Sequence, residues 1–394
     1  MALISFRIKP ADAGGYLFAA GAGVALALQI YQFYSASGPQ QKVAVARTRT
    51  EAAATTNNTS PYPLDVFPDG RDVKTPYGTI RVFEWGPETG EKVLLMHGIG
   101  TPSIALGDMA KAFVDRGCRL MVYDYFGRGY SDAPTDHPYD DRLYTTQLLL
   151  VLASSSLSWT GDEAFHIVGY SLGGALAASF AAYFPHVLRS VNLICPGGLI
   201  RPSHVSLRSR ILYSERLFPA WLSQWIIRSR LEPQHHGPSA DVPVDSFEEE
   251  EGDVDFDQVL LSRDGSKVTV GDVMRWQLRG NPGLVGAYIS TIRNAPVYNQ
   301  HNGLWQLLRA VLEERRLPTD GRLRPRGLPQ GRICLVLATR DPVSVKDEWV
   351  EDSKAVLGED GVDIHVVPGG HEIAITKGAE IASRIMKSWE DLES

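Results

Sequence analysis

The sequence has little cysteine and no long run of basic residues. Its three cysteines, Cys118, Cys195 and Cys334, neither pair evenly nor show the spacing of a metal site. All three fall in or beside apolar runs, where a free thiol behaves as a small hydrophobic group. The 39 Lys and Arg residues are outnumbered by 46 Asp and Glu residues, which gives a formal net charge of −7. This balance disfavours a nucleic-acid partner, and we expect neither a metal ion nor a cofactor.

An uncharged stretch runs from Gly14 to Tyr34. As a helix its 21 residues would span about 31 Å, which matches the hydrocarbon core of a bilayer. We therefore predict a single-pass membrane anchor within residues 1–34. A signal peptide that is removed on secretion is the alternative, because Arg7 and Lys9 precede the apolar run and small residues follow it.

Residues 35–63 are rich in Ala, Ser, Thr, Gln and Asn and contain little that a core would bury. This composition predicts a flexible linker. The segment also contains two overlapping glycosylation motifs, at Asn57 and Asn58, which matter only if this side of the membrane is lumenal.

From Leu64 onward, short apolar runs alternate with helical stretches, as in an α/β domain. Alternating residues on both sides of Pro76-Tyr77-Gly78 predict an antiparallel hairpin over 72–85. Continuous apolar runs of the kind found in buried parallel strands occur at 93–96, 120–123, 164–168, 190–194, 332–338 and 363–367. Helices are predicted at 103–116 and 172–183.

The motif Gly169-Tyr170-Ser171-Leu172-Gly173 follows one of these strands and precedes a stretch of small, helix-forming residues. A strand that enters a helix through G-x-S-x-G is a nucleophile elbow, in which the serine hydroxyl projects above the sheet edge. We expect Gly169 and Gly173 to be structural residues, because the absence of side chains lets the helix pass close to the strands.

Three further motifs follow predicted strands. They are His97-Gly98-Ile99-Gly100, the run DYFGRGYS at 124–131, and Gly369-Gly370-His371. With these motifs around the elbow, the chain resembles the α/β-hydrolase superfamily over roughly 64–200 and from 331 to the C-terminus. The resemblance implies an α/β fold with a mostly parallel central sheet, helices on both faces and an inserted helical cap. We assign 64–200 and 329–394 to the core and 201–328 to the cap.

Ser171, Asp341 and His371 occur in the chain order of the triad of α/β-hydrolases. A serine hydroxyl needs an imidazole to take its proton, and the imidazole needs a carboxylate to orient it. Each of the three residues follows the carboxyl end of a predicted strand, and such positions converge on one edge of a parallel sheet. We predict that these residues form a catalytic triad. Weaker candidates are His365 for the base and Asp347 and Asp363 for the acid.

An oxyanion hole needs two preorganised N–H donors. One is expected from Leu172, at the start of the elbow helix, and by resemblance the second is the amide of Ile99. Because both donors are backbone groups, the identity of their side chains is free, and we expect Ile99 also to line the acyl pocket. We expect His97 and Gly98 to be structural, with His97 bracing the loop by hydrogen bonding and not acting as a catalytic base.

Within the predicted cap, bulky apolar residues from Ile211 to Leu231 alternate with polar ones. We expect this stretch, which includes Trp221 and Trp225, to help enclose the substrate; burial against the core is the alternative. Residues 285–292 and 305–312 also predict helices. The acidic run at 248–255 lacks metal spacing and predicts a solvated loop.

These features together predict a serine hydrolase that cleaves a lipophilic carboxylic ester, a small-molecule substrate, through an acyl-enzyme. A thioesterase, an amidase or a carbon–carbon bond hydrolase of a biosynthetic pathway would carry the same motifs. A binding module without catalytic activity is the alternative from a different class.

Overall fold

The computed structural model describes residues 23, 42–49, 60–214, 217–233, 255–261, 267–317 and 325–390. The chain divides into two compact units, residues 1–42 and 43–394, and the central sheet with its helices belongs to the second. The predicted anchor at 14–34 lies outside the described residues except for Gly23, as do Asn57 and Asn58 and most of the acidic run. Among the described residues, no helix has the length and apolar character needed to cross a bilayer.

The centre of the domain is a sheet of 8 strands in the order β10-β9-β8-β7-β4-β5-β3-β2. Strand β3 runs antiparallel to both β2 and β5, and the remaining neighbours are parallel. The strands are β2 (Gly70–Thr75), β3 (Gly78–Trp85), β4 (Lys92–Met96), β5 (Arg119–Tyr123), β7 (Phe165–Tyr170), β8 (Leu188–Ile194), β9 (Ile333–Ala338) and β10 (Val362–Val367). The predicted hairpin and the predicted parallel strands are all present.

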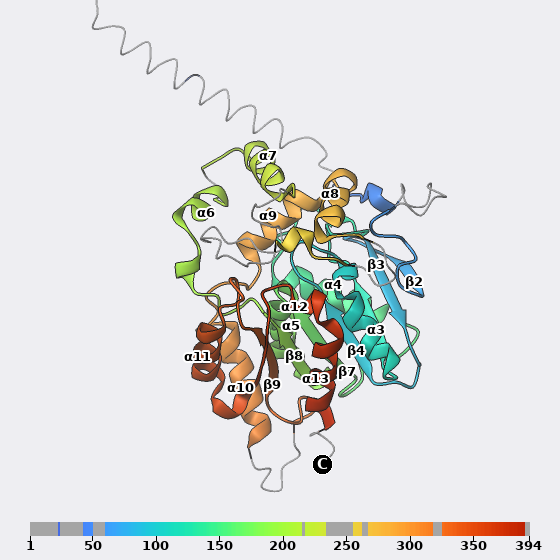
Figure 1. The fold of residues 1–394 in the computed structure, drawn as a ribbon, viewed down its shortest axis with the longest axis vertical. Coiled ribbons are helices and arrows are strands. Elements are labelled where there is room, and N and C mark those ends of the chain that lie inside the picture. Colours follow the sequence, from blue (N-terminus) through green and yellow to red (C-terminus); the bar gives the residue numbers. More distant parts are fainter. Residues whose placement is uncertain are drawn as a thin grey trace, which may run out of the picture. The chain divides into compact units, whose positions relative to one another are not determined.

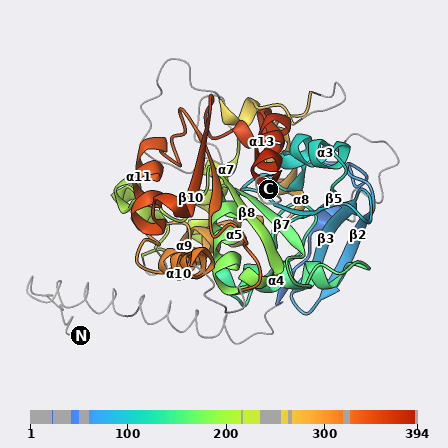
Figure 2. The same ribbon diagram turned by 90° about the horizontal axis from the view of Figure 1, so that it is seen from below.

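Helices cover both faces of this sheet, as Figure 2 shows. On one face α3 (Gly107–Asp115) packs against α13 (Gly378–Glu390) and the short α12 (Ile373–Thr376). On the other face lie α4 (Asp141–Ala153), α5 (Leu172–Tyr183), α10 (Leu304–Arg316) and α11 (Lys346–Leu357). Successive residues of β4 point to opposite faces, so that Leu94 and Met96 join one hydrophobic cluster while Val93 and Leu95 join the other. The predicted fold class is confirmed.

Two stretches of the predicted linker pack against the domain. Strand β1 (Val43–Ala44) pairs with β6 (Ala133–Pro134), and the amide of Ala46 donates to Asp132 Oδ1 at 2.9 Å. Tyr62 is fully buried, and its hydroxyl donates to Asp124 Oδ1 at 3.0 Å. The prediction of a flexible linker over 35–63 is therefore corrected for 43–49 and 60–62, because backbone pairing and a single buried ring do not show in a polar composition.

Between β8 and β9 the chain forms α6 (Leu207–Leu212), α7 (Ala220–Leu231), α8 (Val270–Gly280), α9 (Leu284–Asn294) and α10. The first four lie together at one end of the domain in Figure 1, whereas α10 packs against α5 and α11. Trp305, Leu308 and Leu312 give α10 a wide apolar face that is fully buried. The predicted cap boundary at 328 is thus corrected, because α10 belongs to the layer that covers the sheet.

Candidate active site

Ser171 sits at a sharp turn between β7 and α5. Its backbone has φ 54° and ψ −115°, an unfavourable conformation for a residue with a side chain. A Cβ at Gly169 would lie 2.2 Å from the carbonyl oxygen of Gly173, and a Cβ at Gly173 would lie 2.3 Å from that of Met96. The two glycines therefore permit the close approach of helix and strands that the elbow requires.

The structure brings the three predicted triad residues together. His371 Nε2 lies 2.9 Å from Ser171 Oγ, and His371 Nδ1 lies 2.8 Å from Asp341 Oδ2. A carboxylate can only accept a hydrogen bond, so Nδ1 carries the proton and Nε2 is free to accept the serine hydroxyl. In addition, the Tyr170 hydroxyl donates to the His371 carbonyl at 2.9 Å, which anchors the loop that carries the imidazole. This is the geometry of a general base aligned with its nucleophile.

The weaker candidates lie elsewhere. Asp347 is on α11, with 87% of its side chain exposed, and pairs with Lys346 at 2.9 Å. Asp363 is the second residue of β10, and its carboxylate lies 3.1 Å from His365 Nε2 within the same strand. Neither pair includes a nucleophile.

Asp341 is held as an ionised acceptor. Its Oδ1 accepts the amides of Val343 at 2.7 Å and Ser344 at 2.9 Å. Burial by itself would raise the pKa of Asp341, but the attraction of His371 and the hydrogen bonds around the carboxylate outweigh it and lower the pKa. The carboxylate can therefore stabilise the imidazolium that forms when His371 takes a proton.

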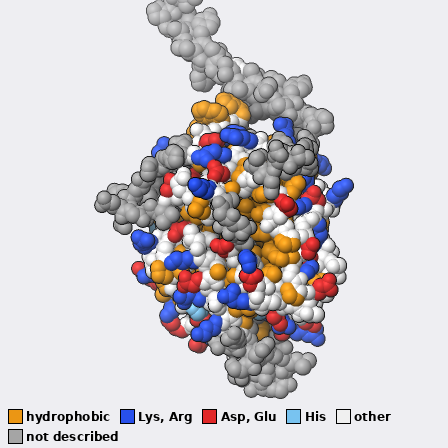
Figure 3. All heavy atoms as spheres, turned by 45° about the vertical axis from the view of Figure 1, so that its right-hand side comes forward, with side chains coloured by type: hydrophobic (Ala, Val, Ile, Leu, Met, Phe, Trp, Pro, Cys, Tyr) orange, Lys and Arg blue, Asp and Glu red, His pale blue; other side chains and the backbone are white. Residues whose placement is uncertain are grey.

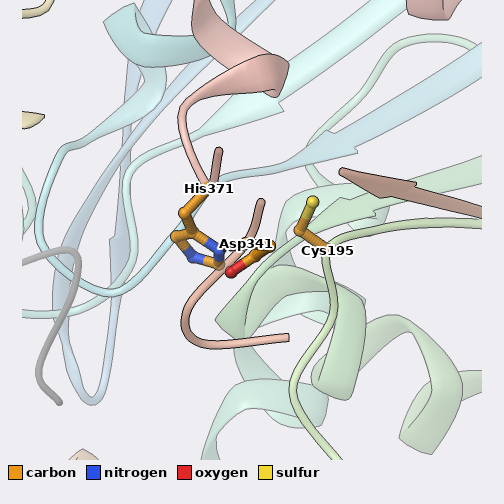
Figure 4. Close-up of side chains that lie close together, drawn as sticks. All are labelled: Cys195, Asp341 and His371. Atoms are coloured by element: carbon orange, nitrogen blue, oxygen red, sulfur yellow. Dashed lines mark hydrogen bonds and ion pairs between the residues drawn. The ribbon is translucent and has the colours of Figure 1, made fainter. Parts of the chain in front are cut away.

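Cys195 is a neighbour of the triad that the sequence did not reveal. It follows β8 directly, and its sulfur lies beside Asp341 and His371, with the donor atoms of the three residues within 4.8 Å of one another (Figure 4). Burial raises the pKa of this thiol well above its usual value, and the charge of Asp341 raises it further, so the sulfur keeps its proton. Its position in the sequence could have indicated this placement, because residues just past the carboxyl ends of parallel strands gather at the same edge of the sheet.

Cys195, Asp341 and His371 place their donor atoms within 4.8 Å of one another, which is a possible metal-binding geometry. A metal would need the cysteine as thiolate and an unprotonated His371 Nδ1. Here burial keeps the thiol protonated, and Nδ1 carries the proton that it donates to Asp341. These protonation states fit the hydrogen-bonded triad better than they fit a metal site.

The loop after β4 carries the predicted oxyanion residue Ile99. His97 Nε2 accepts the amide of Tyr125 at 3.0 Å, so its Nδ1 carries the proton and donates to the Gly98 carbonyl at 2.8 Å. Burial lowers the pKa of His97 to about 3, which keeps the ring neutral in this bracing role. Ile99 and Leu172 both border the cavity beside Ser171.

That cavity has a volume of about 150 Å³ and a mostly apolar lining. Its walls come from the elbow, from the loop after β4, and from α6, α9 and the segments beside them. The lining residues are Ile99, Ser171, Leu172, Gly197, Ile200, His204, Val205, Ser209, Arg210, Tyr213, Ile292, Val297, Tyr298 and Val343. A nucleophile beside an apolar cavity suits an uncharged, lipophilic acyl group.

Trp221 and Trp225 do not line this cavity, contrary to the expectation from the sequence. Their exposed fractions are 69% and 67%, while Ser223 and Ile227 form the buried side of α7. Figure 3 shows hydrophobic side chains at the upper end of the described part of the chain, at the height of α7 in Figure 1. The stretch 211–231 is rich in bulky apolar residues, as the sequence shows. The spacing of those residues, however, did not indicate which face of α7 would be buried.

Known proteins resemble this chain in sequence and in fold. A serine hydrolase-like protein of Dictyostelium discoideum is 30% identical over 134 residues, which cover 33% of this chain and 35% of that protein. Monoacylglycerol lipase ABHD6 of Rattus norvegicus is 27% identical over 117 residues, or 30% of this chain and 34% of the lipase. The chain spans about a third of the length of these curated relatives.

A solved carboxylesterase from Nitrososphaera gargenis has a similar fold, with a TM-score of 0.53 and 14% identity over 82% of this chain and 99% of that one. The sequence model of the family described as "alpha/beta hydrolase fold" matches residues 92–377, which is well over half of the sequence. With its elbow, sheet order and family match, the chain belongs to the α/β-hydrolase fold family.

Proposed function

We propose that the protein is a serine hydrolase that cleaves a lipophilic carboxylic ester through an acyl-enzyme. The observation that carries this proposal is the hydrogen-bonded series from Ser171 through His371 to Asp341 beside an apolar cavity. An oriented nucleophile and base favour an enzyme over a binding module that merely shares the fold. The serine argues against reactions in this family that use an aspartate at the elbow.

In the proposed reaction Ser171 Oγ attacks the ester carbonyl carbon while His371 Nε2 takes the hydroxyl proton. The amides of Ile99 and Leu172 stabilise the negative charge that develops on the carbonyl oxygen. Collapse of this intermediate breaks the ester bond, and His371 returns the proton to the departing alcohol. Water then gives one proton to His371 and attacks the acyl carbon. As this second intermediate collapses, the bond to Ser171 Oγ breaks, His371 returns the proton to that oxygen, and the carboxylic acid is released.

The size of the cavity sets an expectation for the acyl group. An engineered apolar cavity of about 150 Å³ binds benzene, so the present cavity suits an acyl chain of about six carbons. We expect kcat/KM to peak at medium chains when purified protein is assayed with p-nitrophenyl esters from acetate to laurate, with matched thioesters in parallel. Hydrolysis of none of these compounds would refute the proposal, and faster turnover of the thioesters would redirect it to a thioesterase.

One pair of variants separates the cavity wall from the outer surface. Ile292→Ala removes a wall side chain, and we expect the ratio of kcat/KM for long over medium chains to rise about tenfold. The matched control is Trp221→Ala, which truncates an exposed residue of α7 outside the cavity and should leave the ratio unchanged. A shift with Trp221→Ala and none with Ile292→Ala would place acyl selection on α7.

We propose further that residues 14–34 anchor the protein in a membrane, on the basis of their uncharged composition. The full-length protein is then expected to sediment with membranes and to resist extraction by alkaline carbonate. A lipid-dissolved ester would be concentrated at that surface. Recovery of a soluble, secreted product whose N-terminus lies just after residue 37 would instead establish signal-peptide cleavage.

A further inference from the structure

Arg128 is a fully buried cation in the loop that follows β5. Its Nε donates to the Ile99 carbonyl at 3.0 Å, Nη1 donates to the Phe126 carbonyl at 3.3 Å, and Nη2 donates to the Thr291 hydroxyl at 3.0 Å. All three acceptors are uncharged. Burial of a charge costs free energy, which such acceptors offset only in part. A guanidinium in this place is thus a candidate for a role beyond stability.

The contact with Ile99 completes a set of restraints on that residue. The peptide unit before its Cα is held at the Gly98 carbonyl by His97 Nδ1, at 2.8 Å. The peptide unit after it is held at the Ile99 carbonyl by Arg128. Peptide units are planar and trans, so fixing the Gly98 carbonyl also fixes the opposite direction of the Ile99 N–H. These two hydrogen bonds restrict rotation about φ and ψ of Ile99 from both sides.

The same loop is tied to α8 and α9. The Thr291 hydroxyl, on α9, accepts from Arg128, lies 2.7 Å from the Tyr144 hydroxyl and donates to the Ala287 carbonyl at 2.7 Å. Gln277, on α8, donates to the Gly100 carbonyl at 3.0 Å and accepts the amide of Gly129 at 2.7 Å. Arg128 therefore connects the loop after β4 with a helix that also lines the cavity.

We propose that Arg128 is a positioning residue that fixes the Ile99 amide as an oxyanion donor and links its position to α9. This inference rests on the proposed function, because it needs a reaction in which a carbonyl oxygen gains negative charge. Arg128 is not among the residues that line the cavity, so we expect it to make no contact with the substrate. It acts through the Ile99 peptide, and its effect belongs to the transition state and not to substrate binding.

The variant Arg128→Lys tests this role. Lysine keeps the charge, but its single ammonium group cannot reproduce a planar fork that reaches three acceptors. Removal of an oxyanion donor costs about 10²–10³ in kcat, so a displaced donor should lower kcat by about 10–100-fold with KM unchanged. The inhibition constant of a trifluoromethyl ketone, which forms a tetrahedral adduct with Ser171, should rise by the same factor.

Arg315→Lys is the matched control. Arg315 is also buried and donates to backbone carbonyls, those of Gly327, Val311 and Arg326, but it lies on α10 away from the cavity. Both variants should lower the melting temperature, and only Arg128→Lys should lower kcat. An Arg128→Lys enzyme that loses stability but keeps its kcat and its inhibition constant would overturn the proposal.

Two further measurements keep the test decisive. If Arg128→Lys does not fold, Thr291→Val is the second variant. It removes a hydrogen-bond acceptor of Arg128 and should lower kcat with KM unchanged; an unaltered kcat would count against the proposal.

If wild-type protein shows no hydrolysis that depends on Ser171, the proposed function fails, but hydrogen exchange still tests the restraint on the Ile99 peptide. Faster exchange of the Ile99 and Gly100 amides in Arg128→Lys would support it, and unchanged exchange would overturn it.

Discussion

Replacement of Ser171 by alanine is expected to abolish ester hydrolysis while the protein stays folded. In the proposed mechanism the hydroxyl forms the covalent bond to the acyl group, and loss of the serine in a comparable triad costs about a millionfold in kcat. The Ser171 side chain makes no capping hydrogen bond to α5, so we expect the removal of its hydroxyl to leave the helix as stable as before. Steady-state kinetics, circular dichroism and labelling by a fluorophosphonate probe check the three parts of this expectation.

The Ser171→Ala protein should have the wild-type circular dichroism spectrum and no covalent label. A natural control is Ser179→Ala on the same helix, which changes a buried serine away from the cavity and should keep both activity and labelling. If Ser171→Ala retained a tenth of the wild-type rate, the nucleophile would have to be another residue.

The second large effect is expected from Asp341→Asn. An asparagine amide donates a hydrogen bond to His371 Nδ1, where the carboxylate accepts one, and this stabilises the tautomer that cannot take the serine proton. In the best-studied triad the same change lowers kcat by about 10⁴-fold. Measurement of kcat over a range of pH should show this loss at neutral pH.

Asp347→Asn is the appropriate control, because its carboxylate is exposed and pairs with Lys346. This variant should be indistinguishable from wild type in kcat. A severe loss with Asp347→Asn and a mild one with Asp341→Asn would reverse the assignment of the acid.

Much of the fold could be predicted because its signals are local. Strands β4, β5, β7, β8 and β9 are buried on both faces of the sheet. Such strands do not alternate between polar and apolar residues, so each appears in the sequence as a continuous apolar run. Ser171, Asp341 and His371 could be located because each follows the end of such a strand, where the topology of a parallel sheet brings distant residues together.

The features that were missed depend on long-range packing. Trp221 and Trp225 look like core residues until the partner of α7 is known, and Trp305 looks like part of a cap until α5 is seen against it. Strand β1 has only two residues, too few for any periodicity. Cys195 and Arg128 drew no attention in the sequence because each lies beside a neighbour that is distant in the chain, Asp341 for Cys195 and Ile99 for Arg128.

The separation of the triad along the chain has a consequence for folding. Ser171 and His371 are 200 residues apart, and β9 and β10, which precede Asp341 and His371, add to the sheet only beyond β8. Contacts of such long sequence separation require the closure of large loops and form slowly. A nascent chain can thus complete the elbow and the central strands well before the three triad residues are able to meet. In the proposed mechanism, hydrolysis therefore needs the C-terminal strands, because a shorter chain has Ser171 without its acid and its base.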